Sequence, residues 1–418
     1  MKLKKEIINL AKGAKEASAD MLGISAQTKN KILKEMADAL IEKKKEILKA
    51  NKKDSKYARA MGLSSALIDR LSLDAKRIKQ MANSLREIAS LADPVGEVIK
   101  AWRRPNGLWI QKVRVPIGVI AIIYESRPNV TSDCIGLCFK SGNTLILRGG
   151  SEALNSNLAI FRILQDIIKK YGIAQNIINM VTTKDRRAVD ILLKLKDCID
   201  LVMPRGGESL INRVVKYSRI PVIKHYKGIC HIFVDEWADL NMAEKICYNA
   251  KVQRPGVCNA MESLLVHEDI ATRFLPGMLK KFQLAGVEIR GCPLTKKIGK
   301  NIKRATRADY RSEYLDLKLS LRIVKSLDAA IKHINFYGSH HSDSIITENY
   351  ENALKFLRQV DSACVYLNAS TRFTDGNQFG MGAEIGISTD KLHARGPVAL
   401  EELTTYKYIV FGNGQIRE

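Results

Sequence analysis

Short apolar runs alternate with helical patterns along most of this chain, and that alternation constrains its fold more than any other feature. Val119–Tyr124 is continuously apolar, as a strand buried on both faces should be, and Thr144–Leu147 is a second run of this kind. Apolar residues then recur at helical spacing between Leu158 and Ile168. Because strand and helix alternate, the sequence predicts an α/β fold built on a parallel sheet with helices on both faces.

The same order continues and then starts again in a second series. The first series adds strands near 178–181, 199–203 and 222, and helices near 188–195 and 210–217. The second starts at 231–234, with strands at 263–266, 287–290, 321–324, 344–347 and 364–367 and helices near 242–250, 273–284, 327–334 and 350–360. A chain of 418 residues exceeds one ordinary core, so we expect two α/β domains.

Two further segments stand apart from these series. Residues 1 to about 92 show helical spacing, and Ser72 is the predicted N-cap of their last helix. Residues 108–115 follow the turn at 105–107 and are typical of half a hairpin with one exposed face, while residues 404–410 form a last strand. We therefore expect an N-terminal helical segment and a small separate β element.

The net charge of +24 admits two explanations. A basic surface neutralises nucleic-acid phosphates, whereas scattered lysines only solvate helix faces. The lysines are spread through helical patterns and aromatic residues make up only 6%, so we predict no nucleic-acid partner. A positive field would still attract an anionic substrate and cofactor.

Several classes of protein are not favoured by the composition. No run of eighteen apolar residues exists and the first residues are charged, so we expect neither a membrane span nor a signal peptide. The eight cysteines lack paired or zinc-finger spacing, which favours thiols in a reducing cytoplasm. Neighbouring His340 and His341 would point to opposite sides of a strand, so we predict no catalytic metal.

One cysteine has the setting of a nucleophile. Gln253–Glu262 places Cys258 in a turn, after a helix-like run and before a strand-like run. A thiolate in such a turn can attack a carbonyl carbon and hold the acyl group as a thioester. The alternative is that Cys258 is one of several small apolar core residues.

Two glycine turns follow buried strands and open helices. Glycine lets the backbone approach a phosphate, and a helix N-terminus offers unpaired N–H groups, so two such turns indicate a dinucleotide site. Neither turn matches G-x-G-x-x-G, and ordinary turn glycines are the alternative. The candidate cofactor-binding residues are Arg148, Gly149, Gly150, Ser151, Glu152, Pro204, Arg205, Gly206 and Gly207.

Two polar segments complete the candidate site. Asn129 follows the first buried strand, where α/β sheets bind ligands, and could donate its amide to an oxyanion or simply shape a turn. The loop 368–376 carries many donors and one arginine, so it could hold a carboxylate or phosphate or be a plain surface loop.

Together these motifs resemble the gamma-glutamyl phosphate reductase family, the glutamate-5-semialdehyde dehydrogenases, a branch of the aldehyde dehydrogenase superfamily. The resemblance spans nearly the whole chain. It rests on the stretches Pro116–Ile120, Ile123–Thr131, Ser141–Asn143, Arg148–Glu152, Pro204–Gly207, Gly228–His231, Gln253–Glu262, Tyr337–His341, Tyr366–Gly376, His393–Pro397 and Leu403–Lys407.

The resemblance implies an aldehyde-dehydrogenase-like α/β architecture with three parts. Residues 1–100 and 118–228 would form a Rossmann-like domain that binds NADPH. Residues 229–385 would form a smaller catalytic domain that carries Cys258. Residues 101–117 and 390–418 would form a β flap that mediates homo-oligomerisation.

The resemblance also implies a reaction in the cytoplasm, the second step of proline biosynthesis from glutamate. NADPH would reduce L-glutamyl 5-phosphate to L-glutamate 5-semialdehyde and phosphate through a thioester on Cys258, with Asn129 and the Cys258 N–H stabilising the oxyanion. Glu313 would contact the nicotinamide-side ribose. A transient contact with glutamate 5-kinase is a further partner expectation. The expected substrate-binding residues are Arg127, Asn368, Ser370 and Arg372.

One absence favours this branch. Related enzymes that make free acids carry a glutamate that activates water, whereas the corresponding stretch 224–228 here has no carboxylate. A reductase must keep water from its thioester until hydride arrives. A coenzyme-A-acylating aldehyde dehydrogenase also lacks that glutamate and stays open as an alternative, as does a basic nucleic-acid-binding protein.

Overall fold

The computed structural model describes residues 2–224 and 227–417, so His225 and Tyr226 of the stretch discussed above lie outside the described residues. The chain divides into two compact units. Unit 1 holds the described residues up to Lys224, with Gly380–Gly386 and the segment from Val398 onward. Unit 2 holds those from Lys227 to Phe379, with Ile387–Pro397. Residues 390–397, which the sequence assigns to the flap, therefore pack with unit 2.

Unit 1 begins with the expected helical segment. Its helices are α1 (Lys2–Ala17), α2 (Ala26–Glu42), α3 (Lys44–Ala60), α4 (Ser65–Leu71) and α5 (Ala75–Ser90), with the 3-10 turn η1 (Asp20–Gly23). The Ser72 prediction is wrong, because Asp74 caps α5 by accepting from Arg77 N at 2.7 Å. Ser72 ends α4 instead, and its hydroxyl donates to Ile68 O at 2.7 Å.

A parallel sheet forms the centre of unit 1. Its strands run in the order β5-β4-β3-β6, with bounds β3 (Val119–Tyr124), β4 (Thr144–Arg148), β5 (Ile178–Met180) and β6 (Leu201–Arg205). The connecting helices are α6 (Asn129–Lys140), η2 (Ser151–Ala153), α7 (Leu154–Lys170), η3 (Gln175–Ile177), α8 (Arg187–Leu192) and α9 (Glu208–Tyr217). Strand β3 is buried along its length, and alternate residues pack against α1 and α8. The strand expected near Val222 is a single bridge to Val202 within the described residues.

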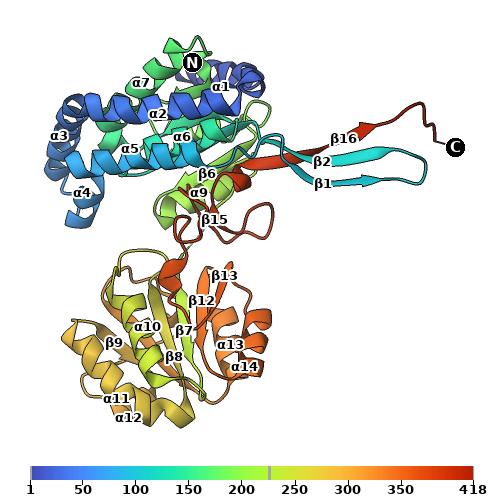
Figure 1. Cartoon of the computed structure of the whole chain (residues 1–418). Coiled ribbons are helices and arrows are strands. Elements are labelled where there is room, and N and C mark those ends of the chain that lie inside the picture. The colour runs from blue at the N-terminus through green and yellow to red at the C-terminus, as the bar shows by residue number, and fades with distance from the viewer. Residues whose placement is uncertain (1, 225–226, 418) are drawn as a thin grey trace. The chain divides into compact units, whose positions relative to one another are not determined.

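The small β element is a three-stranded antiparallel ribbon in unit 1. Strand β2 (Trp109–Pro116) lies between β1 (Val98–Arg103) and β16 (Thr404–Phe411), and the 3-10 turn η6 (Glu401–Leu403) precedes β16. The predicted hairpin and the predicted C-terminal strand thus pair with each other. Figure 1 shows the ribbon projecting beyond the helices of this unit.

Unit 2 is a second parallel sheet, in the order β10-β9-β11-β8-β7-β12-β13. Alternate residues of β7 divide between its faces, because Ile232 and Val234 pack against α10 and α11 while Phe233 packs against α13 and α14. The strands are β7 (Cys230–Val234), β8 (Met261–His267), β9 (Glu288–Gly291), β10 (Lys303–Arg304), β11 (Lys318–Val324), β12 (Ser342–Ile346) and β13 (Cys364–Leu367). The helices are α10 (Leu240–Val252), α11 (Glu268–Leu284), α12 (Pro293–Ile298), η4 (Asp309–Arg311), α13 (Leu327–Tyr337), α14 (Tyr350–Gln359) and η5 (Thr371–Phe373).

Both predicted α/β series are therefore present, and the α/β fold prediction is confirmed. A short pair of strands, β14 (Gly386–Ser388) and β15 (Gly396–Val398), completes the described chain. Among the described residues, no helix combines the length and the apolar character needed to cross a membrane.

Candidate active site

Cys258 lies in a turn between α10 and β8, as the sequence predicts. Ala260 N donates to Val257 O at 3.1 Å and closes the turn around it. Five other cysteines are buried, whereas Cys258 is half-buried. The alternative of a core cysteine therefore does not describe this residue, and its position suits a nucleophile.

A fully buried ion pair closes the base of this turn. Lys251 Nζ, at the end of α10, lies 2.9 Å from Glu262 Oε2 on β8, and neither side chain is exposed. Burial raises the pKa of Glu262 and lowers that of Lys251, and each charge opposes the shift of the other. The second Glu262 oxygen accepts from Leu315 N at 3.1 Å. The turn is thus tied to the loop before β11.

The backbone of Cys258 is enclosed by the segment before β7. A Cβ on Gly228 would lie 1.9 Å from Cys258 O, so no side chain fits there. The buried Cys230 thiol donates to the same carbonyl at 3.2 Å. Gly228 N in turn donates to Glu313 Oε1 at 2.9 Å. A carboxylate from a distant loop therefore reaches the stretch in which the sequence shows none.

The loop after β13 holds the residue that follows the nucleophile. Asn259 Nδ2 donates to Thr374 O at 2.9 Å and to Arg372 O at 3.2 Å, and Thr371 Oγ1 donates to Asn259 O at 2.8 Å. Arg372 Nη1 donates to Asn259 Oδ1. Ser370 caps η5 by accepting from Arg372 N at 3.3 Å. Two expected substrate-binding residues, Ser370 and Arg372, thus lie beside the cysteine turn.

Asn368 does not lie there. Its Oδ1 accepts from Thr347 N and its Nδ2 donates to Thr347 O, both at 2.9 Å. Thr347 directly follows β12, whereas the cysteine turn directly precedes β8, which is parallel to β12 within the sheet. At about 3.3 Å per residue, the carboxyl end of β12 and the amino end of β8 are roughly 15 Å apart. The structure therefore places Asn368 away from Cys258, with its amide engaged.

The glycine turns of unit 1 lie at the carboxyl ends of β4 and β6, and each leads into a helical segment as predicted. Two carboxylates accept hydrogen bonds from backbone N–H groups at this edge. Glu125 Oε2 accepts from Gly207 N at 2.9 Å, and Glu152 Oε1 accepts from Ser126 N and Ser126 Oγ, each at 2.7 Å. These carboxylates suit ribose hydroxyls better than a phosphate.

Arg148 lies at this edge with its side chain largely buried. Its Nη1 donates to Gly149 O at 3.1 Å, while its buried Nε has no hydrogen-bond partner in the described chain. Burial lowers the pKa of this arginine, and the nearby Glu152 opposes that shift. The glycines leave no spare room, since a Cβ on Gly149 would lie 2.2 Å from Asn157 Nδ2. One cation and two carboxylates thus lie at the edge where the sequence predicts the dinucleotide site.

Asn129 is the first residue of α6 and is exposed. Its Nδ2 donates to Asp133 Oδ2 at 3.1 Å, one helical turn further on, and Asp133 Oδ1 accepts from Ser84 Oγ at 2.9 Å. Burial raises the pKa of Asp133 to about 6. The exposed Arg127 lies two residues before Asn129. The amide orientation of Asn129 is therefore fixed from within unit 1.

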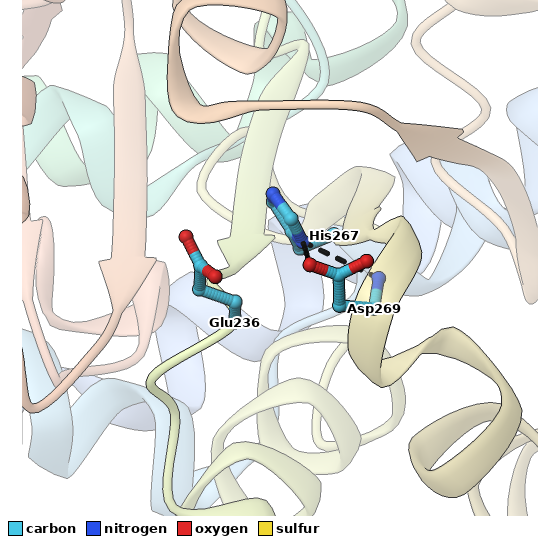
Figure 2. Close-up of side chains that lie close together, drawn as sticks. All are labelled: Glu236, His267 and Asp269. Carbon is cyan, nitrogen blue, oxygen red and sulfur yellow. Dashed lines mark hydrogen bonds and ion pairs between the residues drawn. The ribbon is translucent and has the colours of Figure 1, made fainter.

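One group of side chains has metal-ligand composition. Glu236, His267 and Asp269 bring ligand atoms within 4.8 Å of one another. Figure 2 shows these three side chains close together. His267 is the N-cap of α11, and its Nδ1 accepts from Asp269 N at 3.3 Å. Since that ring nitrogen has one lone pair and the cap uses it, we assign His267 a capping role.

Comparison with known proteins identifies the family. The model of the aldehyde dehydrogenase family matches residues 2–290. The chain is 57% identical to gamma-glutamyl phosphate reductase of Thermodesulfovibrio yellowstonii over the full length of both chains. It is 58% identical to that of Caldanaerobacter subterraneus subsp. tengcongensis, over 98% of this chain and 99% of the relative.

The chain belongs to the gamma-glutamyl phosphate reductase branch of the aldehyde dehydrogenase family.

The crystal structure of gamma-glutamyl phosphate reductase from Thermotoga maritima superposes with a TM-score of 0.97 at 50% identity, over 99% of this chain and 100% of that one. An acetylating aldehyde dehydrogenase from Geobacillus thermoglucosidasius shares the fold at 17% identity, with a TM-score of 0.70 over 100% and 98%. The aldehyde-dehydrogenase-like architecture is therefore confirmed, and the protein is an oxidoreductase of the gamma-glutamyl phosphate reductase branch.

Sequence reasoning missed several residues of this candidate site. Glu125 follows a predicted buried strand directly, so its position was a usable signal. Lys251 and Glu262 flank the predicted cysteine turn, but nothing in one sequence pairs them. Asp133 lies four residues after Asn129 in the same helix, and that spacing brings the two side chains together.

Proposed function

We propose that this protein reduces L-glutamyl 5-phosphate to L-glutamate 5-semialdehyde, with release of phosphate, through a thioester on Cys258. The observation that carries the proposal is the half-buried Cys258, held in a turn whose flanks are braced by buried side chains. The full-length relatives named for this activity support it. The step would serve proline biosynthesis.

The residues act as follows. The Cys258 thiolate attacks the carbonyl carbon of the acyl phosphate, a C–S bond forms, and the C–O bond to phosphate breaks with its electron pair on the leaving oxygen. We assign stabilisation of the oxyanion to the Asn129 amide and the Cys258 N–H. Once the carbon has been reduced, the C–S bond breaks, the aldehyde forms and the thiolate returns.

A nicotinamide dinucleotide supplies the hydride when bound, as aldehyde dehydrogenases use NAD(P). We assign its binding to the edge of unit 1, where Arg148 is positively charged and Glu125 and Glu152 accept hydrogen bonds. NADPH is our proposed form, with Arg148 and Arg205 as the cations nearest the glycine turns. Glu313 stays our candidate for a contact with the nicotinamide-side ribose, and Arg127 for a contact with substrate.

The thioester must survive until it is reduced. In the described residues, the carboxylate that reaches the segment before β7 is Glu313, and it accepts from Gly228 N at 2.9 Å. A carboxylate engaged by a backbone N–H is a poorer base for water, because the hydrogen bond stabilises its charged form. This arrangement favours transfer of the acyl group over hydrolysis.

The Cys258→Ala variant tests the proposal in the reverse direction, with semialdehyde, NADP⁺ and inorganic phosphate. We expect phosphate-dependent NADPH formation to fall by at least about 10⁴-fold, as for loss of other covalent nucleophiles, while NADP⁺ still binds. The Cys292→Ala variant is the matched control, since Cys292 is a second half-buried cysteine of unit 2 and should keep its activity. Substantial turnover by Cys258→Ala, or wild-type turnover with coenzyme A but not phosphate, would refute the proposal.

We also propose that the ribbon β1-β2-β16 mediates homo-oligomerisation. It exposes apolar side chains that a monomer would leave in water, among them Trp109, Tyr408 and Phe411. Light scattering of a Trp109→Lys/Tyr408→Lys/Phe411→Lys variant should report a smaller assembly than the wild type. An unchanged mass would remove this role.

A further inference from the structure

The guanidinium of Arg372 lies across the cysteine turn. Its Nε donates to Gln253 Oε1 at 3.0 Å, and its Nη1 donates to Asn259 Oδ1. These acceptors stand on either side of Cys258 in the sequence, whereas Arg372 comes from the loop after β13. The cation is therefore fixed directly over the segment that carries the nucleophile.

The hydrogen bonds orient this cation without neutralising it. Both acceptors are neutral amide oxygens, so the guanidinium keeps its full charge. The nearest acid along the loop is Asp375, whose Oδ1 accepts from Asn377 N at 3.0 Å and Gln378 N at 3.3 Å. That carboxylate thus serves its own loop, and Arg372 retains charge for a ligand.

A second arginine shares this neighbourhood. Arg254 directly follows Gln253, the residue that Arg372 holds, and it is exposed. Burial lowers the pKa of Arg372 and the charge of Arg254 lowers it further, while Cys258 and Asp375 raise it. Arg254 adjoins the residue that holds Nε of Arg372, and Cys258 adjoins the residue that holds its Nη1, so both cations and the nucleophile belong to one short segment. Two guanidinium groups repel each other, and an anion between them would relieve that repulsion.

We propose that Arg254 and Arg372 form a phosphoryl-binding subsite that holds the phosphate of the acyl phosphate while Cys258 attacks, and then holds the departing inorganic phosphate. This inference rests on the proposed function. As the C–S bond forms and the C–O bond breaks, the electron pair moves onto the phosphate oxygen. Two guanidinium groups stabilise that growing charge. In the reverse direction they hold the phosphate that attacks the thioester.

The position of the pair selects phosphate over the α-carboxylate of the substrate. The leaving phosphate departs from the same carbon that the sulfur attacks, so its binding groups must lie beside the nucleophile. The α-carboxylate is separated from that carbon by the rest of the glutamyl side chain. The planar fork of arginine also matches two phosphate oxygens at once.

The test measures phosphate directly in the reverse reaction. In Arg254→Gln we expect the KM for inorganic phosphate to rise at least tenfold, with the KM values for NADP⁺ and semialdehyde unchanged. Arg254→Lys keeps the positive charge but loses the planar guanidinium. Its KM for inorganic phosphate should lie between that of the wild type and that of Arg254→Gln. The matched control is Arg273→Gln, because Arg273 is an exposed arginine on α11 of the same unit and should behave as wild type.

A second measurement does not depend on turnover. Inorganic phosphate should slow alkylation of Cys258 by iodoacetamide in the wild type and do so at least tenfold less effectively in Arg254→Gln. An unchanged phosphate KM in both Arg254→Gln and Arg372→Gln, or a change confined to the KM for semialdehyde, would overturn the subsite. Wild-type turnover that needs no phosphate would instead overturn the proposed function itself.

Discussion

Units 1 and 2 are both parallel α/β sheets, yet they carry their candidate residues at opposite ends of the strands. In unit 1 the glycine turns follow β4 and β6, at the carboxyl ends where open α/β sheets bind ligands. In unit 2 the cysteine turn precedes β8, at an amino end. The carboxyl-end rule therefore locates the first region from sequence but not the second.

The two regions also differ in how they are held. The edge of unit 1 is built from turns, one exposed and one half-buried carboxylate, and backbone donors. The cysteine turn is held by a buried ion pair, by Gly228, where a Cβ would collide with Cys258 O, and by side chains of the loop after β13. A nucleophile must be placed within a fraction of an ångström, whereas a dinucleotide makes many separate contacts. We infer that the cysteine turn tolerates far less change.

The largest expected effect comes from breaking the buried pair. Lys251→Met leaves the Glu262 carboxylate buried without its partner, which should lower the free energy of unfolding by about 3–5 kcal/mol. The unit 1 counterpart is Lys15→Met, which removes the exposed pair with Asp200 and should cost about 1 kcal/mol or less. Urea unfolding of the full chain measures both.

The double variant Lys251→Met/Glu262→Leu separates charge burial from packing. Replacing both charges with apolar groups should recover most of the stability lost in the single variant. A single-variant cost near that of Lys15→Met would show that the base of the turn is not braced as described.

Replacing one glycine in each region by alanine gives two matched variants, and we expect both to lose less stability than Lys251→Met. Gly228→Ala forces a Cβ to within 1.9 Å of Cys258 O, so the turn must move; we expect a loss of about 1–3 kcal/mol and a large fall in kcat. Gly207→Ala meets its nearest atom, Glu125 Oε2, at 3.9 Å and should change stability by under about 0.5 kcal/mol. Equal effects of the two substitutions on kcat would contradict the contrast.

A further prediction concerns pH and Asp133 in unit 1. Burial raises the pKa of this carboxyl to about 6 from an ordinary 3.8, with the Ser84 and Asn129 hydrogen bonds opposing the shift. Folding therefore takes up a proton between about pH 4 and 6, so the Asp133 contribution to stability falls as the pH rises through that window. The Asp133→Asn variant lacks this proton uptake.

Urea unfolding of the wild type and of Asp133→Asn at half-unit pH steps measures the direction of this pH dependence. The free energy of unfolding of the wild type should decline relative to that of Asp133→Asn from pH 4 to pH 6. A parallel pH dependence of the two proteins would show that Asp133 does not titrate in this range.

Much of the fold was predictable because hydrophobic periodicity reports burial directly. Val119–Tyr124 has a continuous apolar run because the strand is covered on both faces. The position of Cys258 was predictable because its turn is local in the chain. The Lys251–Glu262 pair was not, because pairing depends on how the end of α10 meets β8. Likewise, Asn368 resembles a ligand-binding residue until its pairing with Thr347 is seen.

The β16 strand sets an order of events during synthesis. It completes the ribbon beside β2, and Arg114 reaches Thr404 and Glu401, which lie 290 and 287 residues later. At 5–20 residues per second, roughly 15 to 60 s separate the emergence of these partners from the ribosome. During that interval the β2 edge lacks its β16 partner and stays open to other chains until residues 404–411 have been made.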